Sequence, residues 1–377
     1  MSEVDDDEPG TSPPAKEKPK EEIEGLSAPE DTTWGDYPID TVLIRTETRT
    51  VFDVVRRIEK GAFVMDPDFQ RDFIWPKDKQ SKLIESVLMR IPLPVFYLAE
   101  DERGNMVVVD GLQRLSTFRL FFENKLRLKL PEHPELDKKK FKELSPKLQN
   151  RVEDCNLILY IIDSKVPERA RLDIFERVNG GVPLTRQQMR NCLYMGPATR
   201  FLKEEVSSLE FPLATGNSLD SATMRDREFV NRFLAYYLLP LSDYKGDMDE
   251  YLAMALKKMN KMGPNEVASL SHRFRRSLSN NYHVFGKHAF RKHTREQKDR
   301  GILNASLWDV MTTGLAEYER EQVEAKSGKL QAAFFSLLED PQFASSITYS
   351  PNSTKNARHR FEAARAMLKE VFDADAP

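Results

Sequence analysis

The stretch Val107-Val108-Val109-Asp110-Gly111-Leu112-Gln113-Arg114-Leu115-Ser116-Thr117 predicts a buried strand, a turn at a single glycine and the first turn of a helix. The valines at 107–109 are β-branched, which suits a strand covered on both faces. Asp-Gly between apolar runs is also a common β-hairpin signal. A helix is favoured here because apolar residues recur beyond the glycine at three- and four-residue spacing, at Leu112, Leu115, Phe118 and Phe122.

Residues 110–114, which we call the 110–114 turn, carry polar side chains suited to phosphate chemistry. A helix that begins after Gly111 directs unpaired N–H groups toward the strand end, where they favour an anion such as phosphate. The glycine also lets the backbone approach a ligand without a Cβ atom. Arg114 adds a planar, permanent charge that matches phosphate oxygens. Asp110 is a candidate ligand for Mg²⁺ or water, and Gln113 is a candidate to orient a nucleophile.

Two further blocks flank the turn. The upstream block runs from Asp68 to Pro76 (DFQRDFIWP) and continues through KQSKLIES at 79–86 and IPLP at 91–94. The downstream block is IFERVNGGVPLT at 174–185. These three blocks, in this order, resemble the GmrSD-type restriction endonuclease N-terminal domain family, whose hallmark is an Asp-Gly-Gln-Gln-Arg motif on a ParB/sulfiredoxin-like core. The resemblance is strong over about residues 40 to 195.

The resemblance implies nucleotide binding and hydrolysis in defence against foreign DNA. The chain departs from the commonest form of the hallmark at Leu112, which replaces the first Gln. Because Leu112 belongs to the apolar stripe of the predicted helix, we expect it to face the core and to change little. The family's functional positions fall on Asp110, Gly111, Gln113 and Arg114, on Phe69, Gln70, Arg71 and Trp75, and on Asn179, Gly180 and Gly181.

Three of the candidate residues outside the turn also have purely structural explanations. The aromatic residues around Gln70 and Arg71 suit anchoring of a loop, and we expect both anchoring by these rings and contact of Arg71 with nucleotide phosphates. Asn-Gly-Gly is a common helix terminator, and the resemblance adds an interpretation in which Asn179 faces the nucleotide. Glu85 is either a second carboxylate for the metal, a general base, or the partner of an arginine.

Composition indicates a soluble, cytoplasmic protein. Hydrophobic residues make up 40% and charged residues 31% of 377 residues, and no apolar run approaches the ~20 residues that span a bilayer. Two cysteines, Cys155 and Cys192, do not make a disulfide framework. The N-terminus is acidic and shows no signal peptide. P-loop, dinucleotide-binding and Gly-x-Ser-x-Gly motifs are absent from the sequence, so the 110–114 turn is left as the nucleotide site.

The predicted organisation has three parts. Residues 1–34 are rich in Pro, Glu, Asp, Lys and Ser and should form a disordered acidic tail. Residues 35–195 alternate strands and helices and form the α/β (α+β) nucleotide-binding domain, ParB-like by the resemblance. Residues 196–377 contain helical patterns near 197–210, 223–240, 248–262, 265–278, 302–323, 328–339 and 356–373 and form an all-α domain without strands.

A basic segment lies in the helical domain. Residues 271–300 hold nine Lys or Arg against two acidic residues, together with four of the six histidines. Five-residue spacing does not place His283, His288 and His293 on one helical face, which argues against zinc, and the pattern of an HNH nuclease is absent. A solvated helix surface explains the charges equally well as nucleic-acid binding. The candidate phosphate contacts are Arg273, Arg275, Arg276, Lys287, Arg291 and Lys292.

These features favour an NTPase component of a DNA-defence, type IV restriction-like system. A nucleoside triphosphate would rest on the helix N-terminus, with Arg114 and Arg71 on its phosphates and Mg²⁺ held by Asp110 and Glu85. The expected partners are DNA and a nuclease on another chain, with no membrane contact, and an oligomer is compatible with the sequence. One alternative is a ParB-like nucleotide switch that binds DNA or a protein without turnover. A further alternative is an endonuclease that nicks DNA with Asp110 and Glu85.

Overall fold

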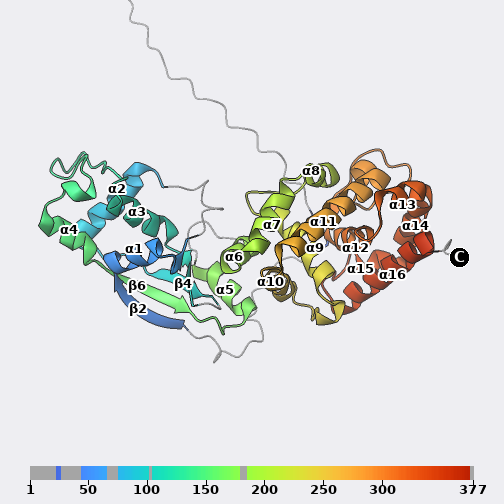
Figure 1. The fold of residues 1–377 in the computed structure, drawn as a ribbon, viewed down its shortest axis with the longest axis horizontal. Coiled ribbons are helices and arrows are strands. Elements are labelled where there is room, and N and C mark those ends of the chain that lie inside the picture. The colour runs from blue at the N-terminus through green and yellow to red at the C-terminus, as the bar shows by residue number, and fades with distance from the viewer. Residues whose placement is uncertain (1–22, 27–43, 66–74, 102–103, 179–184, 374–377) are drawn as a thin grey trace, which may run out of the picture.

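The computed structural model describes residues 23–26, 44–65, 75–101, 104–178 and 185–373. Gln70, Arg71 and Asn179, which were predicted to contact nucleotide, lie outside these ranges. Figure 1 shows an α/β part formed by the N-terminal half and a helical part that follows it. The predicted fold class, a mixed α/β core followed by helices, is therefore confirmed.

The α/β part is built on a five-stranded mixed sheet with the order β2–β6–β4–β5–β3. Neighbouring pairs alternate between antiparallel (β2 with β6, β4 with β5) and parallel (β6 with β4, β5 with β3). Strand β5 contains the buried strand predicted at 107–109. The strands are β2 (Ile44–Thr50), β3 (Phe63–Val64), β4 (Phe96–Glu100), β5 (Met106–Asp110) and β6 (Asn156–Ile162).

Helices pack on one face of this sheet and on part of the other, where Ile44 and Ile158 stay exposed. One face bears Val108 and packs against α1 (Val51–Glu59), α2 (Lys77–Leu88), α3 (Leu112–Phe122) and α4 (Pro146–Glu153). The other face bears Val109 and packs against α5 (Glu168–Val178) and α6 (Arg186–Leu193). Successive side chains of a strand point to opposite faces. An unbroken apolar run at 107–109 is therefore what a doubly covered strand requires.

The hydrophobic core does not divide at residue 195, where the domain boundary was predicted. Phe175 of α5 and Met189 of α6 belong to the same buried cluster as Phe201 and Trp308 of the helical part. A polar contact reinforces this continuity, because Asp249 accepts hydrogen bonds from both Arg186 and Arg190 of α6. In packing terms α5 and α6 connect the sheet to the helical part.

Each predicted segment of the helical part contains a helix, and the segment predicted at 302–323 forms two, α12 and α13. Two further helices, α8 and α15, were not predicted. In the ranges that the structure describes, no helix is long and apolar enough to cross a membrane. The helices are α7 (Pro197–Val206), α8 (Glu210–Thr215), α9 (Arg225–Leu238), α10 (Met248–Met259), α11 (Pro264–Phe285), α12 (Ala305–Leu315), α13 (Arg320–Ala325), α14 (Ser327–Glu339), α15 (Pro341–Ser346) and α16 (Thr354–Asp373). Short 3₁₀ helices are η2 (Phe141–Glu143), η3 (Leu241–Asp243) and η4 (Gly286–His288).

Two very short strands correct the sequence predictions. β1 (Ile23–Glu24) pairs in parallel with β7 (Leu303–Asn304), and the Glu24 carboxylate accepts hydrogen bonds from Lys292 and Asn304. The prediction of a disordered tail is therefore wrong at residues 23–26, and the prediction that strands are absent after residue 195 is wrong at 303–304. A two-residue strand has no periodicity that a sequence pattern can reveal.

Asp53 in the first turn of α1 is surrounded by three arginines, and these ion pairs make a pH-dependent contribution to the stability of the fold. Burial alone would raise the pKa of Asp53, but hydrogen bonds from Arg49, Arg56 and Arg57 lower it to about 2. A carboxyl group whose folded-state pKa is depressed stabilises the fold above its unfolded-state pKa, near 4, and this stability is lost as the pH falls toward 2.

We therefore expect Asp53→Asn to destabilise the protein by about 1 kcal/mol at neutral pH, since solvent screens these part-exposed pairs. The difference from wild type should shrink between about pH 4 and pH 2. Urea denaturation at a series of pH values measures it, and a difference that stays constant down to pH 2 would contradict the assignment.

Candidate functional site

The candidate site lies where β5 ends beside the start of β4. Asp110 is the last residue of β5 and pairs with Tyr97 of β4, next to an irregularity in the register. Its side chain is 36% exposed, and Oδ2 accepts a hydrogen bond from Nη2 of Arg114 at 2.9 Å. Within the described ranges, no hydrogen bond to Oδ1 is present. The strand thus delivers a carboxylate with one oxygen available to a ligand.

Gly111 makes the turn from β5 into α3. Its φ of 96° lies in the left-handed region, which favours glycine. A Cβ atom here would overlap the Phe96 ring and lie 3.2 Å from Nη2 of Arg114. The helix that follows has no side-chain N-cap, and its first internal bond runs from the Leu115 N–H to the Gly111 carbonyl at 2.9 Å. The predicted strand–turn–helix unit is present.

The apolar stripe of α3 faces the core. Leu112 is 6% exposed and belongs to the same cluster as Leu115 and Phe118. The buried residue at the end of the helix is Phe121, not Phe122 as predicted, and the Phe122 ring stacks on Phe141. Leu112 is therefore a core residue, and its departure from the family's hallmark leaves the polar side of the turn unchanged.

Arg114 is held inside the protein. Its guanidinium donates to the backbone carbonyls of Pro94 and Val95 as well as to Asp110, and it lies 4.2 Å from the centre of the Phe96 ring. Burial lowers the pKa of Arg114, and the Asp110 carboxylate opposes that shift. These contacts position the Asp110 carboxylate and fix the entry of β4. Phosphate contact by Arg114 stays a prediction.

We expect Arg114→Ala to destabilise the protein by about 3 kcal/mol, because it leaves two buried carbonyl groups and a carboxylate without their donor. Chemical denaturation measures the change. Arg119→Ala, also on α3 but with a 42% exposed side chain, serves as the matched control and should cost less than about 1 kcal/mol. Equal stability of the two variants would contradict the positioning role.

Gln113 makes a hydrogen bond between the 110–114 turn and Trp75 of the upstream block. Its Oε1 accepts a hydrogen bond from the Trp75 backbone N–H at 3.1 Å. The Trp75 ring in turn lies 4.6 Å from the Lys79 ammonium. Gln113 therefore has its amide oxygen engaged, and among the described residues its amide N–H groups make no hydrogen bond. Its role in orienting a nucleophile stays a prediction.

Glu85 is not brought to Asp110 as a partner. Its Oε1 lies 2.8 Å from Nε2 of His133, in the loop that follows α3. A group of three or more His, Cys, Asp or Glu side chains able to hold a metal ion does not occur in the described ranges. Of the two predicted metal ligands, Asp110 alone lies at the turn, and we retain only Asp110 for the metal.

Most candidates for nucleic-acid contact are engaged within the helical part. Arg273 contacts Tyr237 and Glu317, Arg275 pairs with the buried Glu205, and Arg276 pairs with Glu319. Lys292 binds Glu24 and Thr348. Lys287 is exposed and is left for an outside partner. The clustering in sequence thus reflects ion pairs between helices more than an open basic surface.

Arg291 requires a correction. It has no exposed surface, and its guanidinium donates to the carbonyls of Thr215, Ala289 and Gly301 and to the Ser218 hydroxyl. A fully buried guanidinium cannot reach a phosphate, so Arg291 is a structural residue. The sequence could not show this, because three of its four partners lie 10 to 76 positions away.

Sequence reasoning also missed the segment that completes the turn. Phe96 lies against both Gly111 and Arg114, and the carbonyls of Pro94 and Val95 receive the arginine. The signal was available in the Ile-Pro-Leu-Pro block at 91–94, which the resemblance included without a role.

One of the comparisons with known proteins gives a match. Residues 51–195 match the family model described as GmrSD restriction endonuclease, N-terminal domain. This segment, which contains the whole 110–114 turn, therefore resembles the N-terminal domain of GmrSD-type restriction endonucleases. Searches of curated proteins and of solved structures find no match.

Proposed function

We propose that the 110–114 turn binds a nucleoside triphosphate with Mg²⁺ and hydrolyses its terminal phosphoanhydride bond, as the NTPase component of a type IV restriction-like system. The observation that carries this proposal is the exposed Asp110 carboxylate directly beside the uncapped N-terminus of α3. Carboxylates bind Mg²⁺ and helix N-terminal N–H groups bind phosphates. One turn thus offers partners for both parts of a metal–nucleotide complex.

The backbone supplies the phosphate contacts. Because the first internal bond of α3 starts at Leu115, the N–H groups of Leu112, Gln113 and Arg114 remain outside the helical ladder. Arg71, which lies outside the described residues, is proposed as a further contact to the phosphates.

The site fits a magnesium ion held by one protein carboxylate. Mg²⁺ is usually bound through one or two carboxylates together with substrate phosphates, and Oδ1 of Asp110 is available for that purpose. The bound ion supplies neutralisation of negative charge on the two terminal phosphates. Arg114 holds the other Asp110 oxygen and so fixes the direction in which Oδ1 points.

Gln113 positions the nucleophile in this proposal. Its amide N–H groups donate to the oxygen of the attacking water, since its Oε1 is occupied by Trp75. The water oxygen forms a bond to the terminal phosphorus while the bond to the bridging oxygen breaks, which yields a nucleoside diphosphate and inorganic phosphate. The proton of the water leaves with the phosphate product.

A second candidate function is a nucleotide switch without turnover. The observation that favours it is the pairing of Glu85 with His133, which leaves Asp110 as the one predicted metal ligand at the turn. Nucleotide bound at the turn would then alter binding to DNA or a partner protein without being hydrolysed.

Phosphate release from ATP, GTP, CTP and UTP with Mg²⁺, in the presence and absence of DNA, tests the proposal. We expect release from at least one nucleotide and stimulation by DNA, which would link turnover to defence. Binding of nucleotide without release would support the switch. Neither binding nor release with any of the four would contradict both functions.

A further inference from the structure

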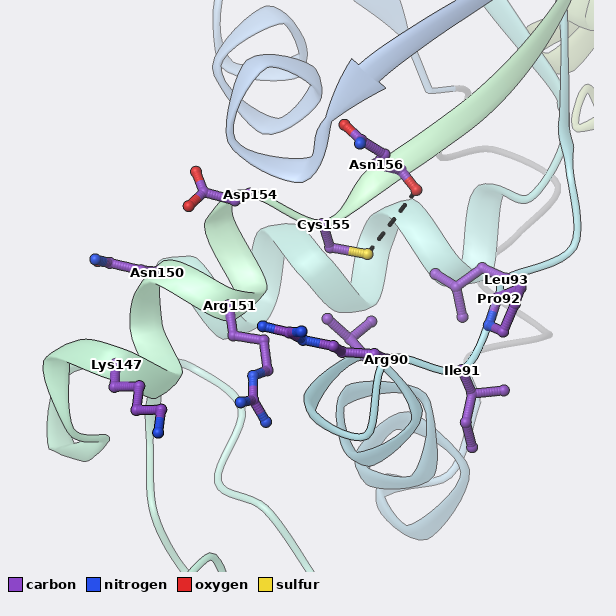
Figure 2. A pocket seen from close by; sticks show the side chains of 11 residues that line it. Arg90, Ile91, Pro92, Leu93, Lys147, Asn150, Arg151, Asp154, Cys155 and Asn156 are labelled. Atoms are coloured by element: carbon purple, nitrogen blue, oxygen red, sulfur yellow. Dashed lines mark hydrogen bonds between the residues drawn. The ribbon is translucent and has the colours of Figure 1, made fainter.

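A pocket of about 460 Å³ lies between the C-terminal end of α2, the 90–93 segment, α4 and the start of β6 (Figure 2). Its size falls in the range of small-molecule sites. The sheet register separates it from the 110–114 turn. Asp110 is level with Tyr160 on β6, so Asn156 in the pocket wall is two strands and four residues away, roughly 16 Å.

The pocket has a cationic side and an apolar side. Figure 2 shows Arg90, Lys147 and Arg151 on one side, and Ile91, Pro92 and Leu93 on the other. Arg151 donates one N–H to the Leu88 carbonyl at 2.8 Å. Within the described ranges, neither the Arg90 guanidinium nor the Lys147 ammonium has an ion pair.

One carboxylate, Asp154, stands against these three cations in the pocket wall. The wall therefore carries a net positive charge of two. Unpaired cations that converge on one cavity attract an anion, and phosphate oxygens suit the planar guanidinium groups.

Arg90 occupies a left-handed backbone position, which favours glycine over arginine. Its φ is 62°, and its N–H donates to the Val87 carbonyl while the Ile91 N–H donates to the Ser86 carbonyl. This pattern is the Schellman motif that ends many helices, and the left-handed residue in it is usually glycine. Arginine there costs backbone strain. A strained cation in a pocket wall points to a role for its side chain.

We propose that this pocket binds a phosphate ester of the nucleotide class, separately from the 110–114 turn. The phosphate contacts Arg90, Lys147 and Arg151, and the base or sugar lies against Ile91 and Leu93. Two sources supply this chemistry, a free nucleotide and a residue of a nucleic-acid strand. Because Asp110 is no part of this site, the proposal stands or falls independently of the proposed hydrolysis.

Binding is measured on the full chain in EDTA, which removes Mg²⁺ and with it the ligand proposed for the 110–114 turn. The probes are inorganic phosphate, thymidine 5′-monophosphate and a short oligothymidylate, titrated by calorimetry or fluorescence anisotropy. The variants are Arg90→Gly, Arg90→Asn and Lys147→Ala. Lys82→Ala, an exposed lysine on α2 outside the pocket, is the matched control, and Asp110→Asn reports on the other site.

We expect Arg90→Gly and Arg90→Asn to weaken binding of the phosphate ester by at least about tenfold, since each loses a charge-assisted hydrogen bond. Both residues tolerate the left-handed region, so the melting temperature should stay at or above that of wild type. Lys147→Ala should weaken binding too, whereas Lys82→Ala and Asp110→Asn should not.

The probes distinguish the sources of the phosphate. Stronger binding of the oligothymidylate, with a salt dependence that falls in Arg90→Gly, identifies a nucleic-acid strand, and preference for the monophosphate identifies a free nucleotide. Either result supports the site. Absence of binding to wild type, unchanged affinity in both Arg90 variants, or an equal loss in Lys82→Ala would overturn the proposal.

Discussion

Replacing Asp309 by Asn should destabilise the protein by about 3–5 kcal/mol, because it removes the negative charge from a fully buried cluster. Asp309 of α12 accepts hydrogen bonds from Arg232 at 2.8 and 2.6 Å and from Arg360 at 3.3 Å. All three side chains are at most 1% exposed. Two guanidinium groups would be left in the core without a counter-charge.

The cluster connects three helices. Arg232 lies on α9 and Arg360 on α16, and Arg360 also donates to the Tyr236 hydroxyl at 3.3 Å. Burial raises the pKa of Tyr236 to about 12, so the phenol stays protonated at neutral pH. Within this cluster, Asp309 is therefore the negative charge that both arginines share.

Chemical denaturation of wild type and Asp309→Asn measures this effect. Glu317→Gln is a suitable control, since it removes an exposed carboxylate paired with Arg273 and should cost less than about 1 kcal/mol. Adding Arg232→Met to Asp309→Asn should recover part of the loss, because it removes one of the two stranded charges. A loss below 1 kcal/mol in Asp309→Asn would show that the cluster is more hydrated than its burial indicates.

The sequence predicted the parts of the fold that have a clear period. The valines before Asp110 form the buried strand β5, and the apolar residues that recur every three or four positions after Gly111 lie on the helix α3. Local patterns determine these elements, so a single sequence is sufficient for them.

Roles that depend on distant residues could not be predicted. In sequence, Arg114 is an arginine beside a strand end, typical of a phosphate ligand. In the structure its partners are carbonyls 19 and 20 positions upstream. Two further arginines are similar. Arg275 pairs with Glu205, 70 positions away, and Arg291 is buried and donates to the Thr215 carbonyl, 76 positions away. Charge in a sequence shows where cations are, while tertiary packing decides what they bind.

The strain at Arg90 shows where a signal was available and overlooked. A helix that ends at Leu88 is usually followed by glycine or asparagine, and here Met89 and Arg90 follow. A departure of this kind from local preference is expected mainly at functional sites. It directs attention to the pocket beside α4.

Asp110→Asn should lower nucleotide hydrolysis at least about 100-fold while leaving the fold intact. The amide oxygen of Asn still accepts the hydrogen bond from Arg114, so β4, β5 and α3 keep their contacts. The charge that holds Mg²⁺ is lost, and metal-ion catalysis is worth several kcal/mol of transition-state stabilisation. Asp299→Asn, an exposed aspartate of the helical part, is the matched control and should retain full activity.

The central claim is tested most directly by phosphate release from the preferred nucleotide, measured in parallel for wild type, Asp110→Asn and Asp299→Asn at equal melting temperature. We predict release by wild type and Asp299→Asn, and at most about one hundredth of that rate by Asp110→Asn. Equal rates in wild type and Asp110→Asn would contradict the claim that hydrolysis takes place at the 110–114 turn.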